Sequence, residues 1–247
     1  MKPLPSPHEI HPFADFLTAE KAIRDAIEAH TRYILFTGES GAGKTTLLRE
    51  LAASIDPCRY RIVYFNLSRL SPGGLVRVLA RALRMPFSRS QPETIQALSR
   101  LLQDEPVQTL LWVDEAQLLP DETFSEIRTL AEADLGGTLP LAFLLAGLPL
   151  LRERLQAPVL FPLWRRLLHR IEITGLRQSE AHPFAIHHIG EARTARIDAG
   201  ALDAIFERSR GLPGLFAAYL DIVGRDTPEG SISREAAEAA IQRWNLP

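Results

Sequence analysis

A glycine-rich segment that ends in lysine and threonine is the part of this 247-residue chain whose residue types most directly imply chemistry. Residues 38–45 read GESGAGKT. Glycines let the backbone approach a phosphate closely, so that successive N–H groups can surround it. Lys44 can then reach the outer phosphates of a nucleotide, and the Thr45 hydroxyl can ligate Mg²⁺. The segment has the pattern of a phosphate-binding loop, or P-loop. The predicted nucleotide-binding residues are Gly38, Glu39, Ser40, Gly41, Ala42, Gly43, Lys44, Thr45 and Thr46.

An acidic pair ends an apolar run further along the chain. Residues 110–115 read LLWVDE. We expect Asp114 to hold Mg²⁺ through a water, and Glu115 to polarise the water that attacks the γ-phosphoryl group. Alternatively, the pair is the acidic start of an exposed loop, a reading that its pairing with the P-loop disfavours. Together the two motifs predict ATP and Mg²⁺ as ligands and ATP hydrolysis as the reaction.

Short β-rich runs alternate with helical patterns and must position these residues. This alternation predicts an α/β fold with a parallel five-stranded sheet and helices on its faces. The consecutive apolar residues in LLWV and AFLLA are typical of strands covered on both sides. The P-loop lies between the strand-like YILFT and the helix-like TTLLRELAAS, as phosphate binding requires. The five predicted strands are residues 33–37, 60–66, 109–114, 141–146 and 170–174.

The pattern becomes purely helical after residue 176. Ser179 and Ser233 are the expected N-caps there, and an amphipathic helix is expected over residues 13–30. We therefore predict a helical lead-in, a P-loop core and a small all-helical domain. Their predicted limits are residues 1–32, 33–176 and 177–247.

The composition is that of an ordinary soluble domain. Hydrophobic residues make up 46% and charged residues 23%, and a formal charge of -2 gives no overall field that favours nucleic acid. The single cysteine, Cys58, cannot form an internal disulfide, which fits a reducing compartment. The longest apolar stretch, residues 139–151, contains two prolines and is shorter than the ~20 residues of a membrane span. No signal-peptide pattern opens the chain. We expect a cytoplasmic protein without a membrane partner.

The motifs together resemble the AAA+ ATPases over nearly the whole chain. The segments DEAQLLPDETFSEIR, LAFLLAGLPLL and SRGLPGLFAAYLDIV are similar to two related groups. One group is the ExeA-like ATPases of secretion, and the other is the TniB, TnsC and MuB group of transposition regulators. The resemblance implies a P-loop AAA+ core followed by a helical lid domain.

Two residues depart from the ExeA-like pattern. Leu148 follows Gly147 where that pattern has a polar residue, and Gly214 follows Pro213 where it has an arginine. These positions, called sensor 1 and sensor 2, contact the γ-phosphate in the family. Their loss predicts slow hydrolysis, with ATP acting largely as an assembly ligand. Ordinary packing is the alternative reading: Leu148 fills the core, and Gly214 starts a helix.

A third departure concerns the end of the sequence. ExeA-like proteins continue into a membrane span and an outer domain, and this sequence ends at Pro247. Together with the GLPG pattern, this favours an ATP-dependent DNA-binding regulator of transposition. Such a protein would oligomerise on target DNA as a ring or filament and recruit a transposase, with a targeting protein as a further partner. The alternatives are an ExeA-like secretion-apparatus ATPase and a nucleotide-binding adaptor without useful turnover, which Glu115 opposes.

Three arginines precede or begin the predicted last strand. The segment LWRRLLHRIEI holds Arg165, Arg166 and Arg170. The resemblance implies that an arginine here acts in trans on the γ-phosphate of a neighbouring subunit, and Arg170 best matches the family position. For each of the three, an ordinary surface role on an amphipathic helix is the alternative.

Another group of arginines follows the predicted second strand. Arg77, Arg81 and Arg84 recur at i, i+4 and i+7, so they are expected to share one helix face. The resemblance to the transposition regulators places DNA contacts just after the second core strand, which selects Arg69 and Arg77. The expected ligand is duplex DNA bound through phosphates, without base-specific contacts. A solvated helix face or a partner surface is the alternative.

Overall fold

The structure is a computed structural model that describes residues 11–65, 70–86, 88, 90–132, 140–227 and 229–244. Its described residues form two compact units. The α/β unit lies within Ala19–Gly38 and Leu48–Glu172, and the helical unit lies within Met1–Thr18, Glu39–Leu47 and Ile173–Pro247. Among these described residues, no helix has both the length and the apolarity to cross a bilayer.

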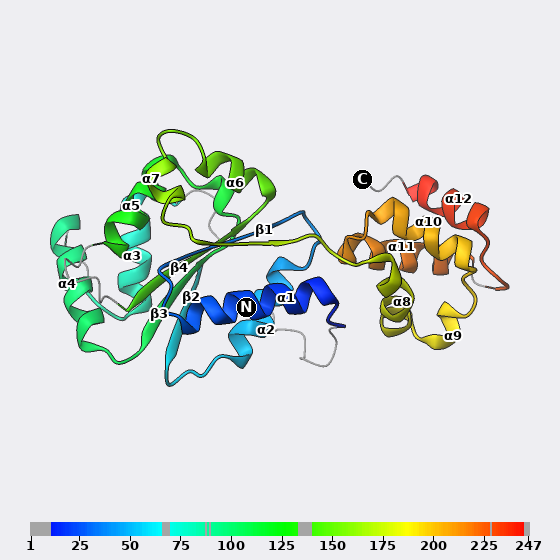
Figure 1. The fold of residues 1–247 in the computed structure, drawn as a ribbon, viewed down its shortest axis with the longest axis horizontal. Helices are drawn as coiled ribbons and strands as arrows, with labels where there is room; N and C mark the ends of the chain where they lie inside the picture. Colours follow the sequence, from blue (N-terminus) through cyan, green and yellow to red (C-terminus); the bar gives the residue numbers. More distant parts are fainter. Residues whose placement is uncertain are drawn as a thin grey trace. The chain divides into compact units, whose positions relative to one another are not determined.

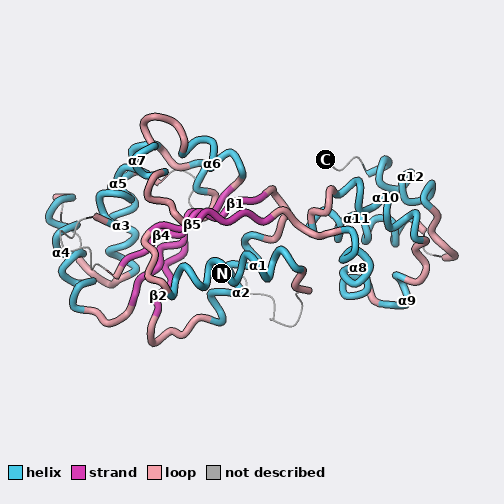
Figure 2. The backbone as a smooth tube through the Cα atoms, viewed as in Figure 1, coloured by secondary structure: helices cyan, strands magenta, loops and turns pink. Residues whose placement is uncertain are grey.

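A five-stranded sheet is the framework of the α/β unit and confirms the predicted fold class (Figure 2). The strand order is β2-β3-β4-β1-β5. Every residue of β1, β3 and β4 is buried, as their apolar sequences predict, whereas β2 and β5 each have exposed residues. Residue 66, the predicted end of the second strand, lies outside the described residues. The strands are β1 (Tyr33–Gly38), β2 (Tyr60–Phe65), β3 (Gln108–Val113), β4 (Leu141–Gly147) and β5 (His169–Ile173).

The register brings three functional segments to one edge of the sheet. β4 pairs in parallel with both β1 and β3. Thr37 lies opposite Gly147, and Val113 lies opposite Leu145. Gly38, Leu148 and Asp114 therefore all lie at the carboxyl ends of neighbouring strands, which is where ligands bind in open α/β sheets.

Helices cover both faces of the sheet (Figure 1). On one face, α3, α5, α6 and α7 pack on a continuous apolar core, and α4 packs against α3. On the other face lie α1 and α2, and Ile23 and Ile27 of α1 are fully buried. The bounds are α1 (Ala14–Glu28), α2 (Lys44–Ser54), α3 (Pro72–Ala82), α4 (Gln91–Asp104), α5 (Asp121–Ala131), α6 (Pro149–Leu155) and α7 (Phe161–Trp164).

The helical unit contains α8 to α12, and its core lies between α10, α11 and α12. Phe216, Tyr219 and Leu220 of α11 are fully buried. Ser233 caps α12 as predicted, because its hydroxyl accepts the Ala236 N–H at 3.4 Å. The helices are α8 (Ala181–Ile189), α9 (Glu191–Thr194), α10 (Ala199–Ser209), α11 (Pro213–Asp226) and α12 (Arg234–Trp244).

The predicted N-cap at Ser179 is wrong. Ser179 lies inside a short 3-10 turn, Gln178–Glu180. The Glu180 carboxylate takes the capping role there, since it accepts the Arg177 N–H at 2.8 Å and the Ala14 N–H at 2.7 Å. The two oxygens of a glutamate carboxylate can each accept one backbone N–H, whereas a serine side chain is shorter and has a single oxygen.

Candidate nucleotide site

Residues 39–46 of the predicted P-loop belong to the helical unit, and their backbone has the conformation that the glycines permit. Gly41 has φ +81° and Gly43 has φ +98°, in the left-handed region that side chains disfavour. Helix α2 begins at Lys44, so its N–H groups follow the loop directly. This is the arrangement of backbone donors and helix N-terminus that holds a polyphosphate.

Lys44 is buried within this loop. Its side chain is only 7% exposed, and its ammonium donates to the Glu39 carbonyl at 2.9 Å. A lysine ammonium in a glycine-rich loop at a helix start is a common phosphate ligand. The position of Lys44 therefore fits the predicted contact to a nucleotide.

The start of α11 touches the P-loop through backbone atoms. The Gly214 N–H donates to the Gly41 carbonyl at 2.9 Å. A Cβ on Gly214 would lie 3.2 Å from both Cα and O of Gly41, which is tighter than an ordinary van der Waals contact. The glycine that departs from the ExeA-like arginine therefore has a packing reason, in agreement with the reading of Gly214 as a helix-start residue.

Asp114 directly follows β3 and accepts hydrogen bonds from Tyr64 and from the next backbone N–H. It is 4% exposed, its Oδ2 accepts the Tyr64 hydroxyl at 3.3 Å, and its Oδ1 accepts the Glu115 N–H at 3.0 Å. Tyr64 on β2 packs on the Trp112 ring, with centroids 4.4 Å apart. Tyr64 is not predictable from the sequence, because the pairing of β2 with β3 that brings it near Asp114 has no signal there.

Glu115 stands in a strained turn and is bound by a neighbouring amide. Its φ of +51° is unusual for a residue with a side chain, and such strain is concentrated at functional sites. Its Oε2 accepts the Gln117 Nε2–H at 2.5 Å, and Gln117 Oε1 accepts the Leu148 N–H at 3.1 Å. Gln117 is a second residue that the sequence analysis did not assign, although it lies in the DEAQ segment.

The predicted site residues thus meet in two groups. Asp114, Glu115 and Leu148 come together in the α/β unit, and Gly41 and Lys44 come together in the helical unit. Thr45 and Asp114 carry the hydroxyl and carboxylate oxygens that Mg²⁺ prefers, so the donor set fits the predicted metal. When bound, Mg²⁺ neutralises charge on the β- and γ-phosphate oxygens.

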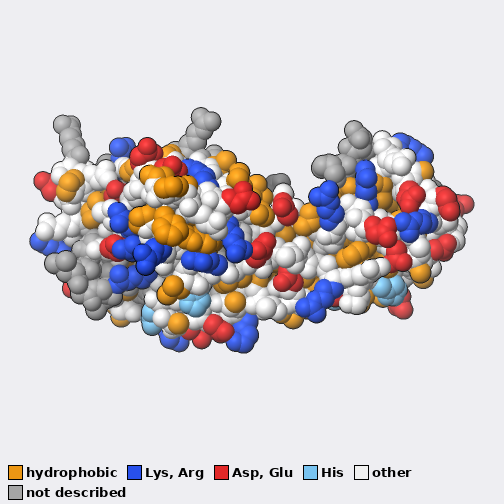
Figure 3. Space-filling view, turned by 45° about the horizontal axis from the view of Figure 1, so that its top comes forward, with side chains coloured by type: hydrophobic (Ala, Val, Ile, Leu, Met, Phe, Trp, Pro, Cys, Tyr) orange, Lys and Arg blue, Asp and Glu red, His pale blue; other side chains and the backbone are white. Residues whose placement is uncertain are grey.

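The three arginines near β5 differ in their surroundings. The Arg170 guanidinium stacks on the Trp164 ring at 3.6 Å from its centroid and donates to the Trp164 carbonyl at 2.9 Å. Arg166 forms an ion pair with Glu132, and Arg165 is exposed. Basic and hydrophobic side chains lie side by side on one face of the α/β unit (Figure 3). The trans role of Arg170 stays a prediction.

The predicted arginine stripe is shorter than expected. Arg77 and Arg81 are exposed on α3. The helix ends at Ala82, and Arg84 adopts φ +53° beyond that end, so the prediction that Arg84 shares their face is wrong. Arg69 lies outside the described residues. Contacts of Arg69 and Arg77 with DNA stay a prediction.

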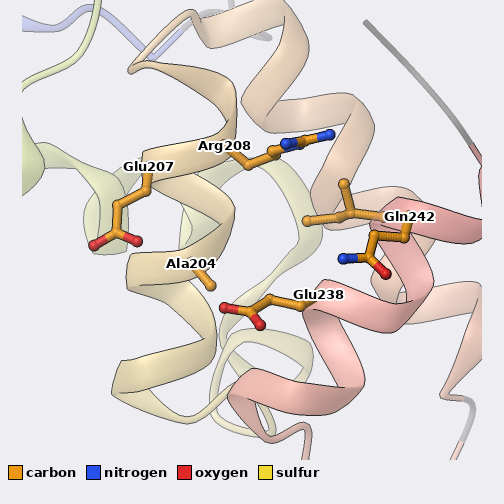
Figure 4. Close-up of a pocket in the computed structure, with 6 residues that line it drawn as sticks. Ala204, Glu207, Arg208, Glu238 and Gln242 are labelled. Carbon is orange, nitrogen blue, oxygen red and sulfur yellow. The ribbon is translucent and has the colours of Figure 1, made fainter.

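A pocket of about 300 Å³ lies between α10 and α12, apart from the P-loop residues. Glu238 extends from α12 toward Ala204 of α10 (Figure 4). Glu207 and Glu238 both pair with Arg234, at 2.7 Å and 2.8 Å. The two carboxylates thus share one guanidinium within the helical unit, and no P-loop residue lines this pocket.

Comparisons with known proteins agree with this geometry. One relative is the General secretion pathway protein A of Aeromonas hydrophila, 25% identical over 232 residues. The match covers 87% of this chain and 42% of the relative, so the chain spans less than half of that protein's length.

Solved structures share the fold at lower identity. Cdc6p from Pyrobaculum aerophilum is 17% identical, with a TM-score of 0.68 over 97% of this chain and 69% of that one. The Aeropyrum pernix ORC2 protein in ADPNP-ADP complexes is 13% identical, with a TM-score of 0.61 over 92% of this chain and 66% of that one.

The model of the AAA domain matches residues 27–155, more than half of the chain, including the P-loop and the acidic pair. This protein therefore belongs to the AAA domain family.

Proposed function

We propose that this protein binds ATP with Mg²⁺ and hydrolyses it slowly. The observation that carries the proposal is the buried Lys44 ammonium at the start of α2, inside a loop whose glycines have positive φ. The P-loop N–H groups and Lys44 hold the phosphates, as in other P-loop proteins. The AAA domain match and the nucleotide complexes of the similar ORC2 protein support this ligand.

Glu115 is the proposed general base. Its carboxylate accepts a proton from the attacking water as the water oxygen bonds to the γ-phosphorus. The bond from that phosphorus to the β–γ bridging oxygen breaks, which releases ADP and phosphate. Asp114 adjoins Glu115 at the same sheet edge as the start of the P-loop, where a water-bridged Mg²⁺ would lie.

Slow turnover follows from the sensor 2 position. Gly214 cannot offer a charged side chain to the γ-phosphate. Removing one donor that stabilises transition-state charge costs about 10²–10³ in kcat in well-studied enzymes. We therefore expect hydrolysis far below that of a family member with the sensor 2 contact, and a bound-ATP state that persists.

The test compares Glu115→Gln with the wild type and with Glu122→Gln. The amide cannot accept the proton, so turnover should fall by about 10²-fold or more while ATP binding is kept. Glu122 is an exposed residue of α5, and its variant removes the same charge away from the β3 turn. Wild-type turnover in Glu115→Gln would remove Glu115 from the role of base.

For the wider process we favour an ExeA-like ATPase of a secretion apparatus. The similarity to the General secretion pathway protein A supports this reading. The GLPG pattern that favoured transposition carries less weight, because Gly214 has a packing reason at Gly41.

The second candidate is a regulator of transposition that assembles on duplex DNA and recruits a transposase. The exposure of Arg77 and Arg81 on α3 favours it. It requires sequence-tolerant DNA binding with an ATP analogue, weakened equally on all sequences by Arg77→Ala, and assembly weakened by Arg170→Ala. Sedimentation with and without DNA decides between the candidates, because a protein that ignores duplex DNA in both nucleotide states excludes the second.

A further inference from the structure

We propose that Gln117 is a positioning residue for hydrolysis: its amide orients the Glu115 carboxylate and ties it to the backbone at the end of β4. This inference rests on the proposed ATPase function and adds a residue to it. Gln117 lies in the 3-10 turn Ala116–Leu118 and is 8% exposed. A buried amide must satisfy both its donor and its acceptor, and Gln117 does so at two different strand ends.

The orientation of the amide is fixed by its partners. The Leu148 N–H is a donor, so the atom that faces it at 3.1 Å must be the amide oxygen. The amide NH₂ group then faces the Glu115 carboxylate, where an acceptor is required, at 2.5 Å from Oε2. This interaction occupies Oε2 and leaves Oε1 as the atom that accepts the proton of water.

The backbone of the same turn is held by a side chain of α6. The Arg154 guanidinium of α6 donates to the Gln117 carbonyl at 2.6 Å and also pairs with Asp121 at the start of α5. Gly147 provides the space for the amide, because a Cβ at that position would overlap Gln117 Oε1. Backbone and side chain of Gln117 are thus both fixed, so the Glu115 carboxylate has a rigid partner.

This arrangement replaces what a polar side chain at Leu148 would supply. At the end of β4, Leu148 offers its backbone N–H but no polar side chain. The polar side chain there is that of Gln117, which lies in the turn after the neighbouring strand β3. A misplacement of about 1 Å in a reacting group can cost 10²-fold in rate. An amide that holds the base in place therefore acts on kcat, and it leaves the affinity for ATP to the P-loop.

The experiment measures kcat and ATP affinity in Gln117→Met and Gln117→Glu. Methionine keeps the length and removes both hydrogen bonds, so kcat should fall about ten- to a hundredfold at unchanged affinity. Glutamate keeps the acceptor for the Leu148 N–H but places a second anion beside Glu115. It should reduce kcat at least as much as methionine. Gln156→Glu, at an exposed position after α6, introduces the same charge elsewhere and should leave kcat unchanged.

Which of the two variants has the lower kcat separates a positioning role from a packing role. If Gln117 only fills space and holds β4, Gln117→Glu should be close to wild type and Gln117→Met should be worse. In a Glu115→Gln background, Gln117→Met should add no further loss of the single-turnover rate, because the two residues act as a unit.

Three results would overturn the inference. They are wild-type kcat in Gln117→Glu, an undiminished effect of Gln117→Met in the Glu115→Gln background, and a rise of kcat in either single variant. Its failure is distinct from that of the proposed function. Turnover that depends on Glu115 but not on Gln117 refutes only the positioning role, whereas a wild-type protein without turnover refutes the function itself.

Discussion

The end of β4 and the start of α11 both lack a polar side chain that related ATPases use at the γ-phosphate, yet the two places are built differently. At the end of β4, the Leu148 N–H is bound by Gln117, whose amide also holds the catalytic candidate Glu115. At the start of α11, the Gly214 N–H binds the Gly41 carbonyl directly. At Leu148, another element supplies a polar side chain, that of Gln117. At Gly214, the chain instead makes a close backbone contact with the P-loop.

This difference assigns different roles to the two places. A side-chain network around Glu115 affects the chemical step, because it orients the group that accepts the proton. A backbone contact with the P-loop affects how the loop is presented to the phosphates, and so affects binding. The comparison predicts that changes at the end of β4 alter kcat and that changes at the start of α11 alter the affinity for ATP.

The largest effect is expected for Gly147→Ala. The added Cβ would displace the Gln117 amide, so kcat should fall about ten- to a hundredfold with little change in ATP affinity. Loss of the part-buried bond to the Leu148 N–H should also lower the free energy of unfolding by about 0.5–1.5 kcal/mol. Steady-state kinetics and chemical denaturation measure the two effects. Gly224→Ala is the control, since a Cβ there meets nothing within 4 Å.

A smaller effect is expected for Gly214→Ala. The Cβ would crowd Gly41 at 3.2 Å and lengthen the bond to its carbonyl. Loss of one such bond costs about 0.5–1.5 kcal/mol, which weakens ATP binding by roughly two- to tenfold. Calorimetry should detect this change while kcat at saturating ATP stays constant. A fall in kcat at constant affinity would mean that α11 acts on the chemical step, and the comparison would fail.

The smallest effect is expected for Leu148→Gln, which restores a polar side chain at the end of β4. Gln117 already binds both the Leu148 N–H and Glu115, so the new amide has no vacant role there. Turnover should change by no more than about 0.5 kcal/mol in activation free energy, roughly a factor of two. A tenfold gain in kcat would show that Gln117 does not compensate for the missing polar residue.

The sequence predicted the elements that depend on local pattern. Five short β-rich runs became the five strands. Of these, β1, β3 and β4 are buried throughout and have the consecutive apolar residues that such strands need. The family match over residues 27–155 includes both the P-loop and the acidic pair. Arg84 was misplaced because the spacing rule assumes an unbroken helix, and α3 ends at Ala82.

The unpredicted residues are those whose partners are distant in sequence. Gln117 and Leu148 meet only because β3 and β4 are neighbours in the sheet, and Tyr64 reaches Asp114 only because β2 pairs with β3. Gly214 was recognised as a departure from the family pattern. Its packing reason depends on the contact with Gly41, which no spacing in the sequence reveals.

Calorimetric titration with ATP, with and without Mg²⁺, tests the central claim most directly when wild type and Lys44→Ala are compared. We expect wild type to bind ATP more tightly with Mg²⁺, because Thr45 and Asp114 offer metal-ligating oxygens. Lys44→Ala should lose at least about tenfold in affinity, since the buried ammonium is the proposed partner of the phosphates. Equal affinity in the two proteins would contradict the account.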